Sequence, residues 1–406
     1  MSDSTTVVPE QLGEEFLQDP HALNERLRAE APVRPVVLPR GLNVWLVTRY
    51  ADVRAALADP RLHKDSRHID ELFELNTDSS AETFHTGEAL FAHMLNSDPP
   101  DHERLRRLVN KAFTARRIEQ LRPRIEEITD GLLADIGPTA DVDLLDVFAF
   151  PLPITVICEL LGVPTKDRDD FRRWSNVLVS GGVPAEEIDE SAIAMAGYLS
   201  AMIEAKRAEP GADMMSALVQ AHDEGDRLTQ DELVAMAFLL LVAGHETTVN
   251  LIANGVLALI TNPDQLAALR ADRGLLPGAI EEFLRFESPV KNATFRFTVE
   301  PTEVGGVVIP ARQLVVLSLG SANRDSDRYA EPDRLDIERD TSGHMAFGHG
   351  IHYCLGAPLA RLEAEIAFNG LLDTYDRIEL AVPTADLRWR PGMLIRGLER
   401  FPVHLA

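Results

Sequence analysis

The chain has 406 residues, 45% apolar and 26% charged, which is typical of a globular protein with a large core. Its formal net charge of −25 argues against nucleic acid and anionic membranes as partners, and two cysteines exclude a disulfide framework. The N-terminal residues MSDSTTVVPEQLGEEF hold neither a basic segment nor an apolar run, so we expect no membrane anchor and a cytoplasmic location. No linker divides the sequence, so we expect one domain over residues 1–406.

The first hundred residues mix helix and strand patterns. Apolar periodicity predicts helices over Pro20–Glu30 and Tyr50–Leu57, with a strand pair, Val33–Val37 and Asn43–Val47, between them. The stretch Ser66–Ser97 is polar and weakly periodic, and we expect it to be irregular.

A helix is predicted to begin after the double proline at 99–100. His102 and Arg106 are four residues apart, so they share one face of this helix. Residues 101–124 carry eight basic and three acidic side chains, a local charge of +5 in an acidic protein. Further helices are expected over Arg124–Gly137, Pro151–Gly162 and Ala192–Ala208, with an irregular connection over Ser175–Glu190.

The longest apolar stretch is Leu233–Ile260, which holds one acid and no Arg or Lys. Thr229 and Glu232 form a capping box that predicts where the helix starts. At 1.5 Å per residue this helix is about 42 Å long, so a transmembrane span is one interpretation. Polar residues from His245 onward and the lack of basic flanks favour a central helix of a large core instead.

The middle of this helix reads AGHETT, from Ala243 to Thr248. Small side chains at Ala243 and Gly244 leave room beside a flat ligand, and a mid-helix glycine costs about 1 kcal/mol relative to alanine, so it needs a reason. Glu246 followed by Thr247 provides a proton donor and a hydroxyl relay. A buried Glu–Thr pair is also common as a purely structural feature.

A helix is predicted over Pro277–Phe286, in which Glu282 and Arg285 are three residues apart. Alternating and apolar patterns then predict short strands. We expect β-rich regions near residues 33–47, 294–319 and 387–405 within a mainly α architecture.

Cys354 lies between closely spaced glycines and directly before an apolar, helix-favouring run. A cysteine ahead of a helix N-terminus meets free backbone N–H groups and the positive end of the helix dipole, which both favour the thiolate. The alternatives are a buried structural cysteine or a Cys–His nucleophile with His352. The spacing of His349 and His352 does not match a zinc motif. Cys158 lies in an apolar run and is expected in the core.

The loop Phe347–Gly356, FGHGIHYCLG, and the following APLARLEAEIA resemble the haem-binding signature of the cytochrome P-450 superfamily. AGHETT resembles that family's oxygen-binding motif, and the similarity runs nearly end to end. The resemblance implies a mainly α fold with a small β region, a long central helix over haem b, and Cys354 as the axial ligand of the iron. The cofactor-binding residues that it implies are His102, Arg106, Ala243, Gly244, Arg296, Phe347, Gly348, His352, Cys354 and Gly356.

The resemblance also implies that Glu282 and Arg285 are locked to a third arginine. That partner is expected to be Arg334 in EPDRLD, where Leu335 stands in place of the family's usual phenylalanine. We expect this network to support the fold beneath the cysteine loop and to take no part in catalysis.

By the same resemblance the protein is a monooxygenase that inserts one oxygen atom from O2 into a C–H bond of a bulky apolar substrate. Glu246 and Thr247 would deliver protons, and electrons from NAD(P)H would arrive through ferredoxin reductase and an acidic ferredoxin that meets the basic residues of 101–124. The sequence is most similar to the branch that hydroxylates macrolides and other polyketides, with steroid or vitamin D-type sterol hydroxylation as the alternative. A haem-based gas sensor or carrier has no use for the acid–hydroxyl pair, and a peroxide-driven oxygenase typically lacks it.

Overall fold

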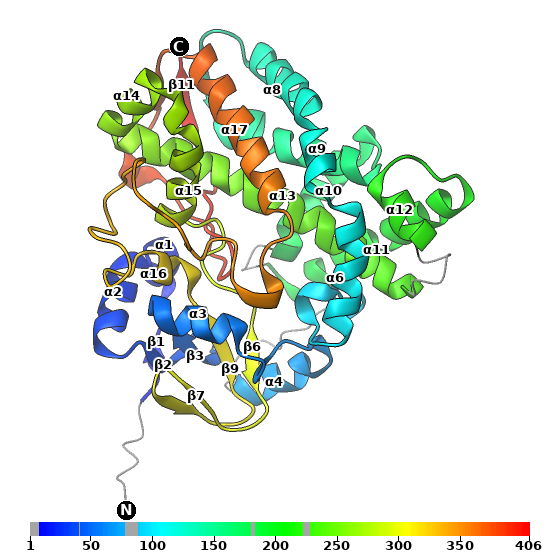
Figure 1. Ribbon diagram of the computed structural model, residues 1–406, viewed down its shortest axis with the longest axis vertical. Helices are drawn as coiled ribbons and strands as arrows, with labels where there is room; N and C mark the ends of the chain where they lie inside the picture. The colour runs from blue at the N-terminus through cyan, green and yellow to red at the C-terminus, as the bar shows by residue number, and fades with distance from the viewer. Residues whose placement is uncertain (1–7, 40, 78–87, 180–182, 222–227) are drawn as a thin grey trace, which may run out of the picture.

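The apolar stretch expected over residues 233–260 forms helix α13 (Gln230–Thr261), which runs through the middle of the computed structural model (Figure 1). The structure describes residues 8–39, 41–77, 88–179, 183–221 and 228–406. The predicted capping box is present: the Thr229 hydroxyl accepts from the Glu232 N–H, and the Glu232 carboxylate accepts from the Thr229 N–H. By length and composition α13 could cross a membrane, but 78% of its apolar window is buried, as in a core helix.

The molecule is mainly α with a small β region, as predicted. The helices gather around α13, whereas the largest sheet lies at the other end of the molecule beside the N-terminal helices (Figure 1). The other helices are α1 (Glu14–Gln18), α2 (His21–Glu30), α3 (Tyr50–Ala58), α4 (Ile69–Asn76), α5 (Glu88–Phe91), α6 (Asp101–Ala112), α7 (Ala115–Glu119), α8 (Arg122–Ile136), α9 (Pro151–Leu161), α10 (Arg168–Val179), α11 (Ala185–Ala208), α12 (Met214–Ala221), α14 (Pro263–Ala271), α15 (Leu276–Phe286), α16 (Leu319–Asn323) and α17 (Ala357–Thr374).

The strands form a six-stranded sheet of order β1-β2-β3-β9-β6-β4, a three-stranded sheet β10-β11-β5 and the hairpin β7-β8. The predicted pair Val33–Val37 and Asn43–Val47 is confirmed as antiparallel β2 and β3. Within the predicted β-rich region 387–405, which is described throughout, only residues 402–405 form a regular strand, and an isolated bridge joins Trp389 to Leu398. The remaining strands are β1 (Glu10–Gln11), β4 (Leu62–His63), β5 (Ala140–Asp143), β6 (Arg296–Thr298), β7 (Thr302–Val304), β8 (Val307–Ile309), β9 (Leu314–Leu317), β10 (Ile378–Leu380) and β11 (Pro402–Leu405).

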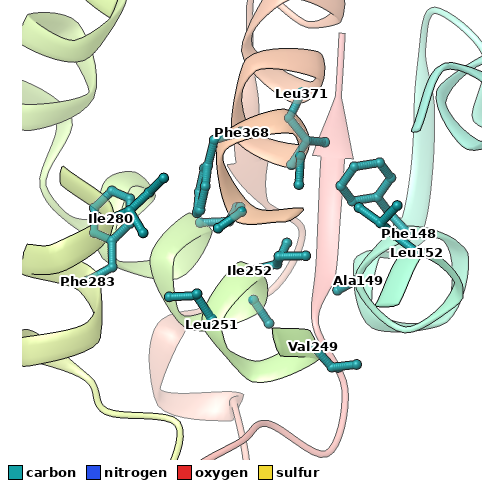
Figure 2. Packing of buried hydrophobic residues seen from close by; sticks show 14 of the residues in the cluster. Phe148, Ala149, Leu152, Val249, Leu251, Ile252, Ile280, Phe283, Phe368 and Leu371 are labelled. Atoms are coloured by element: carbon teal, nitrogen blue, oxygen red, sulfur yellow. The ribbon is translucent and has the colours of Figure 1, made fainter. Parts of the chain in front are cut away.

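The largest apolar cluster surrounds the second half of α13. Figure 2 shows side chains of α13 between those of α15, α17 and the turn that precedes α9. Ile252 of α13 is fully buried there, as are Phe368 of α17 and Phe148 of that turn. Fixing α13 between these helices places its polar middle segment at a defined depth in the protein.

Two expected irregular stretches contain helices. Within Ser66–Ser97 the chain forms α4, α5 and single 3₁₀ turns, and residues 78–87 lie outside the described part. Within Ser175–Glu190, α10 continues to Val179 and α11 begins at Ala185, while Gly181 and Gly182 lie outside the described residues. Tertiary packing overrides the weak local signal, since α10 packs along α11.

The network around Glu282 differs from the prediction in its third member. Arg285 donates to both carboxylate oxygens of Glu282 at 2.7 Å, and both side chains are fully buried. The third arginine is Arg339, whose Nε lies 3.4 Å from Glu282 Oε1. The prediction of Arg334 was wrong: its side chain is 58% exposed and pairs with Asp336, and only its carbonyl accepts from Arg285 and Arg339. Leu335 is buried in the core, so the departure from phenylalanine concerns packing.

Candidate active site

A cavity of about 370 Å³ is lined both by the middle of α13 and by the cysteine loop. Segments far apart in the sequence meet here: the N-terminal half of α6, the start of β6, and residues 346–360. Every residue predicted for the site lines this cavity: His102, Arg106, Ala243, Gly244, Glu246, Thr247, Arg296, Phe347, Gly348, His352, Cys354 and Gly356. Cys158 lies instead on α9, where it is fully buried in the apolar core.

The cysteine loop is closed by a hydrogen bond from the Cys354 N–H to the Phe347 carbonyl at 2.9 Å. Gly348 and Gly350 adopt φ of 72° and 75°, a region that L side chains rarely occupy, so the turn requires glycine at both positions. At Gly350 a Cβ would also approach the Leu57 carbonyl to 3.0 Å. The loop therefore fixes the position of the Cys354 sulfur at the base of the cavity.

The Cys354 thiol lies at the N-terminus of α17, where the backbone N–H groups of Gly356 and Ala357 point to its sulfur. These contacts lower its pKa, as do Arg106 and Arg361, but burial outweighs them and the pKa of Cys354 is raised. The N–H groups at the helix N-terminus therefore favour the thiolate, as expected, but burial outweighs them in the protein by itself. A bound metal cation reverses this balance, because a coordinating thiol is deprotonated.

Two neighbouring histidines, His102 and His352, line the cavity. The ring centroids of His102 and His352 are 4.3 Å apart. Neither ring nitrogen of His102 has a hydrogen-bond partner among the described residues, although His102 is only 2% exposed. Burial lowers the pKa of His102, and burial together with the nearby charge of Lys64 lowers the pKa of His352 to about 2. Both imidazoles are therefore neutral in the protein without ligand.

Three basic side chains line the cavity together with these histidines: Lys64, Arg106 and Arg296. Arg296 is 4% exposed and donates to the carbonyls of Leu62 and Leu57, while its Nε has no partner in the part of the chain that the structure describes. Burial lowers the pKa of Arg296 to about 10. Burial also lowers the pKa of Lys64 well below its usual range, and repulsion from Arg296 is the second cause of that shift. Arg106 donates to the Tyr353 carbonyl at 2.6 Å.

This cluster fits the carboxylates of a haem. Buried cations and unpartnered donors cost free energy unless an anion is present, and carboxylates accept strong hydrogen bonds from exactly such groups. With a sulfur ligand in a rigid loop on the same cavity, the residues present match a haem held by thiolate and by its propionates.

The two small residues of α13 serve different purposes. Ala243 is exposed to the cavity on an otherwise buried helix, as expected for a residue beside a flat ligand. Gly244 is needed for helix packing, because a Cβ there would lie 2.6 Å from Cδ1 of Ile157 in α9. The explanation of Gly244 as room for a cofactor is therefore incomplete.

Glu246 and Thr247 both line the cavity, but each side chain is held by another partner. Arg390 Nη1 donates to Glu246 Oε2 at 3.0 Å, and the Glu246 side chain is 4% exposed. The Thr247 hydroxyl donates to the Ala243 carbonyl at 3.1 Å, which leaves its oxygen lone pairs available to the cavity. A proton that passes between them therefore needs a water molecule or a side-chain rotation.

The wall of the cavity away from the cysteine loop is apolar. His93 is an exception: it is 3% exposed, its Nδ1 has no partner within the described ranges, and burial lowers its pKa to about 3. Its ring lies nearly parallel to that of Phe238, with centroids 6.4 Å apart. The apolar lining comes from Phe91, Met94, Leu178, Phe238, Leu239, Leu394 and Ile395.

The sequence interpretation missed Lys64 and Arg390. Lys64 is one of five lysines in an arginine-rich chain, and this rarity is the only sequence signal that marks it. No pattern marks Arg390, because it reaches Glu246 from 144 residues further along the chain.

Comparisons with known proteins agree with this geometry. The pattern of the family described as Cytochrome P450 matches residues 186–384. The chain is 55% identical to Cytochrome P450 107B1 of Saccharopolyspora erythraea, over 98% of this chain and 99% of that protein. It is 54% identical to Vitamin D(3) 25-hydroxylase of Pseudonocardia autotrophica, over 96% and 95% respectively. The solved structure of the tirandamycin C-bound P450 monooxygenase TamI superimposes with a TM-score of 0.92 at 55% identity, covering 98% of this chain and all of that one.

Proposed function

This chain belongs to the cytochrome P450 family, and from that membership we propose the roles of its residues and the class of its substrate. It is a haem-thiolate monooxygenase that uses O2, redox partners and an organic substrate. The haem, when bound, supplies the iron at which O2 is activated. One observation carries the proposed roles: a cysteine in a rigid loop, a cluster of buried or half-buried basic side chains and an acid–hydroxyl pair all border one cavity.

Cys354 is proposed as the iron ligand of haem b. His102, Arg106, Arg296 and His352 are proposed to hold the haem carboxylates, and the unpartnered nitrogens of His102 and Arg296 support this. We add Lys64 to this set, because it is buried beside Arg296 and, among the described residues, Asp98 is the acid that favours its charged form.

Glu246 and Thr247 are proposed to bring protons to the cavity. Glu246 would take up a proton on a carboxylate oxygen and pass it to a water molecule in the cavity, and Thr247 Oγ1 would hold that water by accepting its hydrogen bond. The apolar wall excludes bulk water, which limits competing proton delivery.

The proposed substrate is a bulky, largely apolar polyketide such as a macrolide. The apolar lining and the similarity to the polyketide-hydroxylating branch support this, as does the relative that binds tirandamycin C. A vitamin D-type sterol is a second candidate, because one relative at 54% identity is named for that reaction. We also propose that the chain acts as one domain in the cytoplasm.

Titration of the haem protein with a macrolide aglycone and with cholecalciferol tests the substrate class. A substrate that binds in the cavity beside the haem would change the haem spectrum, so each affinity can be read directly. Saturable binding of the aglycone at lower concentration than cholecalciferol is expected. The reverse order would replace the polyketide proposal with the sterol one.

The proposed electron donors are a ferredoxin and its reductase. Arg107 and Lys111 of α6 and Arg116 of α7 are exposed, and α6 carries His102 and Arg106 on its buried side. An acidic ferredoxin bound here would lie close to the haem. Arg104 is a poor member of this surface, because it forms an ion pair with Glu232 and is 29% exposed.

Charge reversal tests this docking surface. Arg107→Glu and Lys111→Glu should lower ferredoxin-driven turnover most at low ionic strength, where screening is weak. Arg104→Glu should instead lower thermal stability, because it places two acids together at the start of α13. Ferredoxin-driven rates that stay unchanged in both exposed variants would locate docking elsewhere.

A further inference from the structure

Arg390 connects three separate parts of the protein. Its Nη1 donates to Glu246 of α13 at 3.0 Å, and its Nη2 donates to Asn176 Oδ1 of α10 at 3.2 Å. The Arg390 side chain is 19% exposed, so the ion pair is largely shielded from water and salt.

The segment that carries Arg390 is fixed on α13. The Arg390 N–H donates to the Gly397 carbonyl at 2.8 Å, and a bridge joins Trp389 to Leu398. Gly397 packs closely on Asn250 of α13, because a Cβ added at Gly397 would lie 1.9 Å from Asn250 Oδ1. Asn254, one turn further along α13, donates to the Arg396 carbonyl at 2.9 Å. The guanidinium therefore approaches Glu246 from a rigid base.

The other neighbour of the Glu246 carboxylate does not supply a positive charge. His245 Nε2 lies 3.8 Å from Glu246 Oε1, but burial lowers the pKa of His245, so its ring is neutral. Its Nδ1 is 2.8 Å from the Leu241 carbonyl and must donate, so Nε2 accepts from the Ser175 hydroxyl at 3.2 Å. Among the described residues, Arg390 is thus the cation that faces this carboxylate.

We propose that Arg390 is a positioning residue that holds the Glu246 carboxylate, and that Asn176 makes this hold depend on the position of α10. The inference rests on the proposed role of Glu246. A guanidinium can bind both partners because its donors form a planar fork, whereas a lysine ammonium cannot match that geometry. Asn176 is three residues from the end of α10, so a shift of α10 moves or releases the arginine, and the carboxylate is then free to rotate toward Thr247.

The test uses the haem-loaded full chain and compares Arg390→Met, Arg390→Lys and Asn176→Leu with Arg388→Gln, an exposed arginine two residues earlier. Arg390→Met should lower the product formed per NAD(P)H by about tenfold, because the Glu246 carboxylate is then misplaced. The dependence of this ratio on pH should change as well. Substrate affinity and the carbon monoxide spectrum should stay at wild-type values. Asn176→Leu and Arg390→Lys should give the same change to a smaller degree, and Arg388→Gln none.

A stability measurement tests the pair without turnover. Arg390→Met leaves a buried, uncompensated carboxylate and should lower the urea midpoint, and adding Glu246→Gln should recover most of that loss. Additive changes of the urea midpoint in the double variant would overturn the proposal. So would a ratio of product to NAD(P)H that keeps its wild-type value and pH dependence in Arg390→Met and Asn176→Leu. Loss of the thiolate-type carbon monoxide spectrum in the wild-type protein would instead contradict the proposed function itself.

Discussion

Replacing Gly244 with alanine separates two explanations of a glycine in the middle of α13. Alanine gains about 1 kcal/mol of helix propensity over glycine, which by itself would stabilise the protein. However, the new methyl group would lie 2.6 Å and 2.7 Å from Cδ1 and Cγ1 of Ile157. Overpacking of this kind costs about 1–3 kcal/mol, so we expect Gly244→Ala to change the free energy of unfolding by between about zero and 2 kcal/mol, in the destabilising direction.

Removing the opposing side chain should reverse the sign. Ile157→Ala by itself creates a cavity at a cost of about 2–5 kcal/mol. In that background Gly244→Ala should become stabilising by about 1 kcal/mol, because only the helix propensity remains. Urea unfolding of the four proteins followed by circular dichroism gives the interaction energy directly.

Gly131 of α8 provides the matched control. No atom would lie within 4 Å of its Cβ, so Gly131→Ala should stabilise by about 1 kcal/mol regardless of Ile157. Equal destabilisation by Gly244→Ala in both backgrounds, with haem content lowered in both, would refute the packing argument and favour contact with the cofactor.

Three further predictions concern buried charges. Glu363 is fully buried, and its carboxylate has no hydrogen-bond partner among the described residues. Burial raises its pKa well above the usual 4.5, so the folded state keeps a proton that the unfolded state releases above that pH. Glu363→Gln should therefore gain stability over wild type by up to about 1.4 kcal/mol per pH unit above 4.5, measured by urea unfolding at pH 5 and 8. Arg339→Ala should destabilise by about 1–3 kcal/mol and Arg334→Ala by less than about 0.5, and equal thermal shifts would reject the assignment to Glu282. Lys64→Met should speed haem transfer to apomyoglobin, whereas Lys291→Met, at an equally buried lysine outside the cavity lining, should not.

The sequence was sufficient to predict features that depend on local pattern. The capping box of Thr229 and Glu232 begins α13 as expected, because side chain and backbone partners are only three residues apart. His102 and Arg106 line the same cavity because a helical spacing of four fixes their common face.

Features that depend on long-range packing were not predictable in the same way. Arg339 takes the place expected for Arg334 because the turn geometry of residues 331–339, which no periodicity reports, decides which side chain faces Glu282. Ile157 explains Gly244 only once α9 is placed against α13. The raised pKa of Cys354 depends on how completely the loop is buried, and burial cannot be read from a helix N-terminus alone.

The most direct test of the account is the carbon monoxide spectrum of the reduced, haem-loaded protein. The wild-type protein and Cys158→Ser should both show the spectrum of a thiolate-ligated haem, because Cys158 is buried in α9 away from the cavity lining. Cys354→Ser should lose that spectrum, since a hydroxyl is a far weaker donor to iron. A thiolate spectrum retained in Cys354→Ser, or absent from the wild-type protein, would contradict the assignment of Cys354 as the iron ligand.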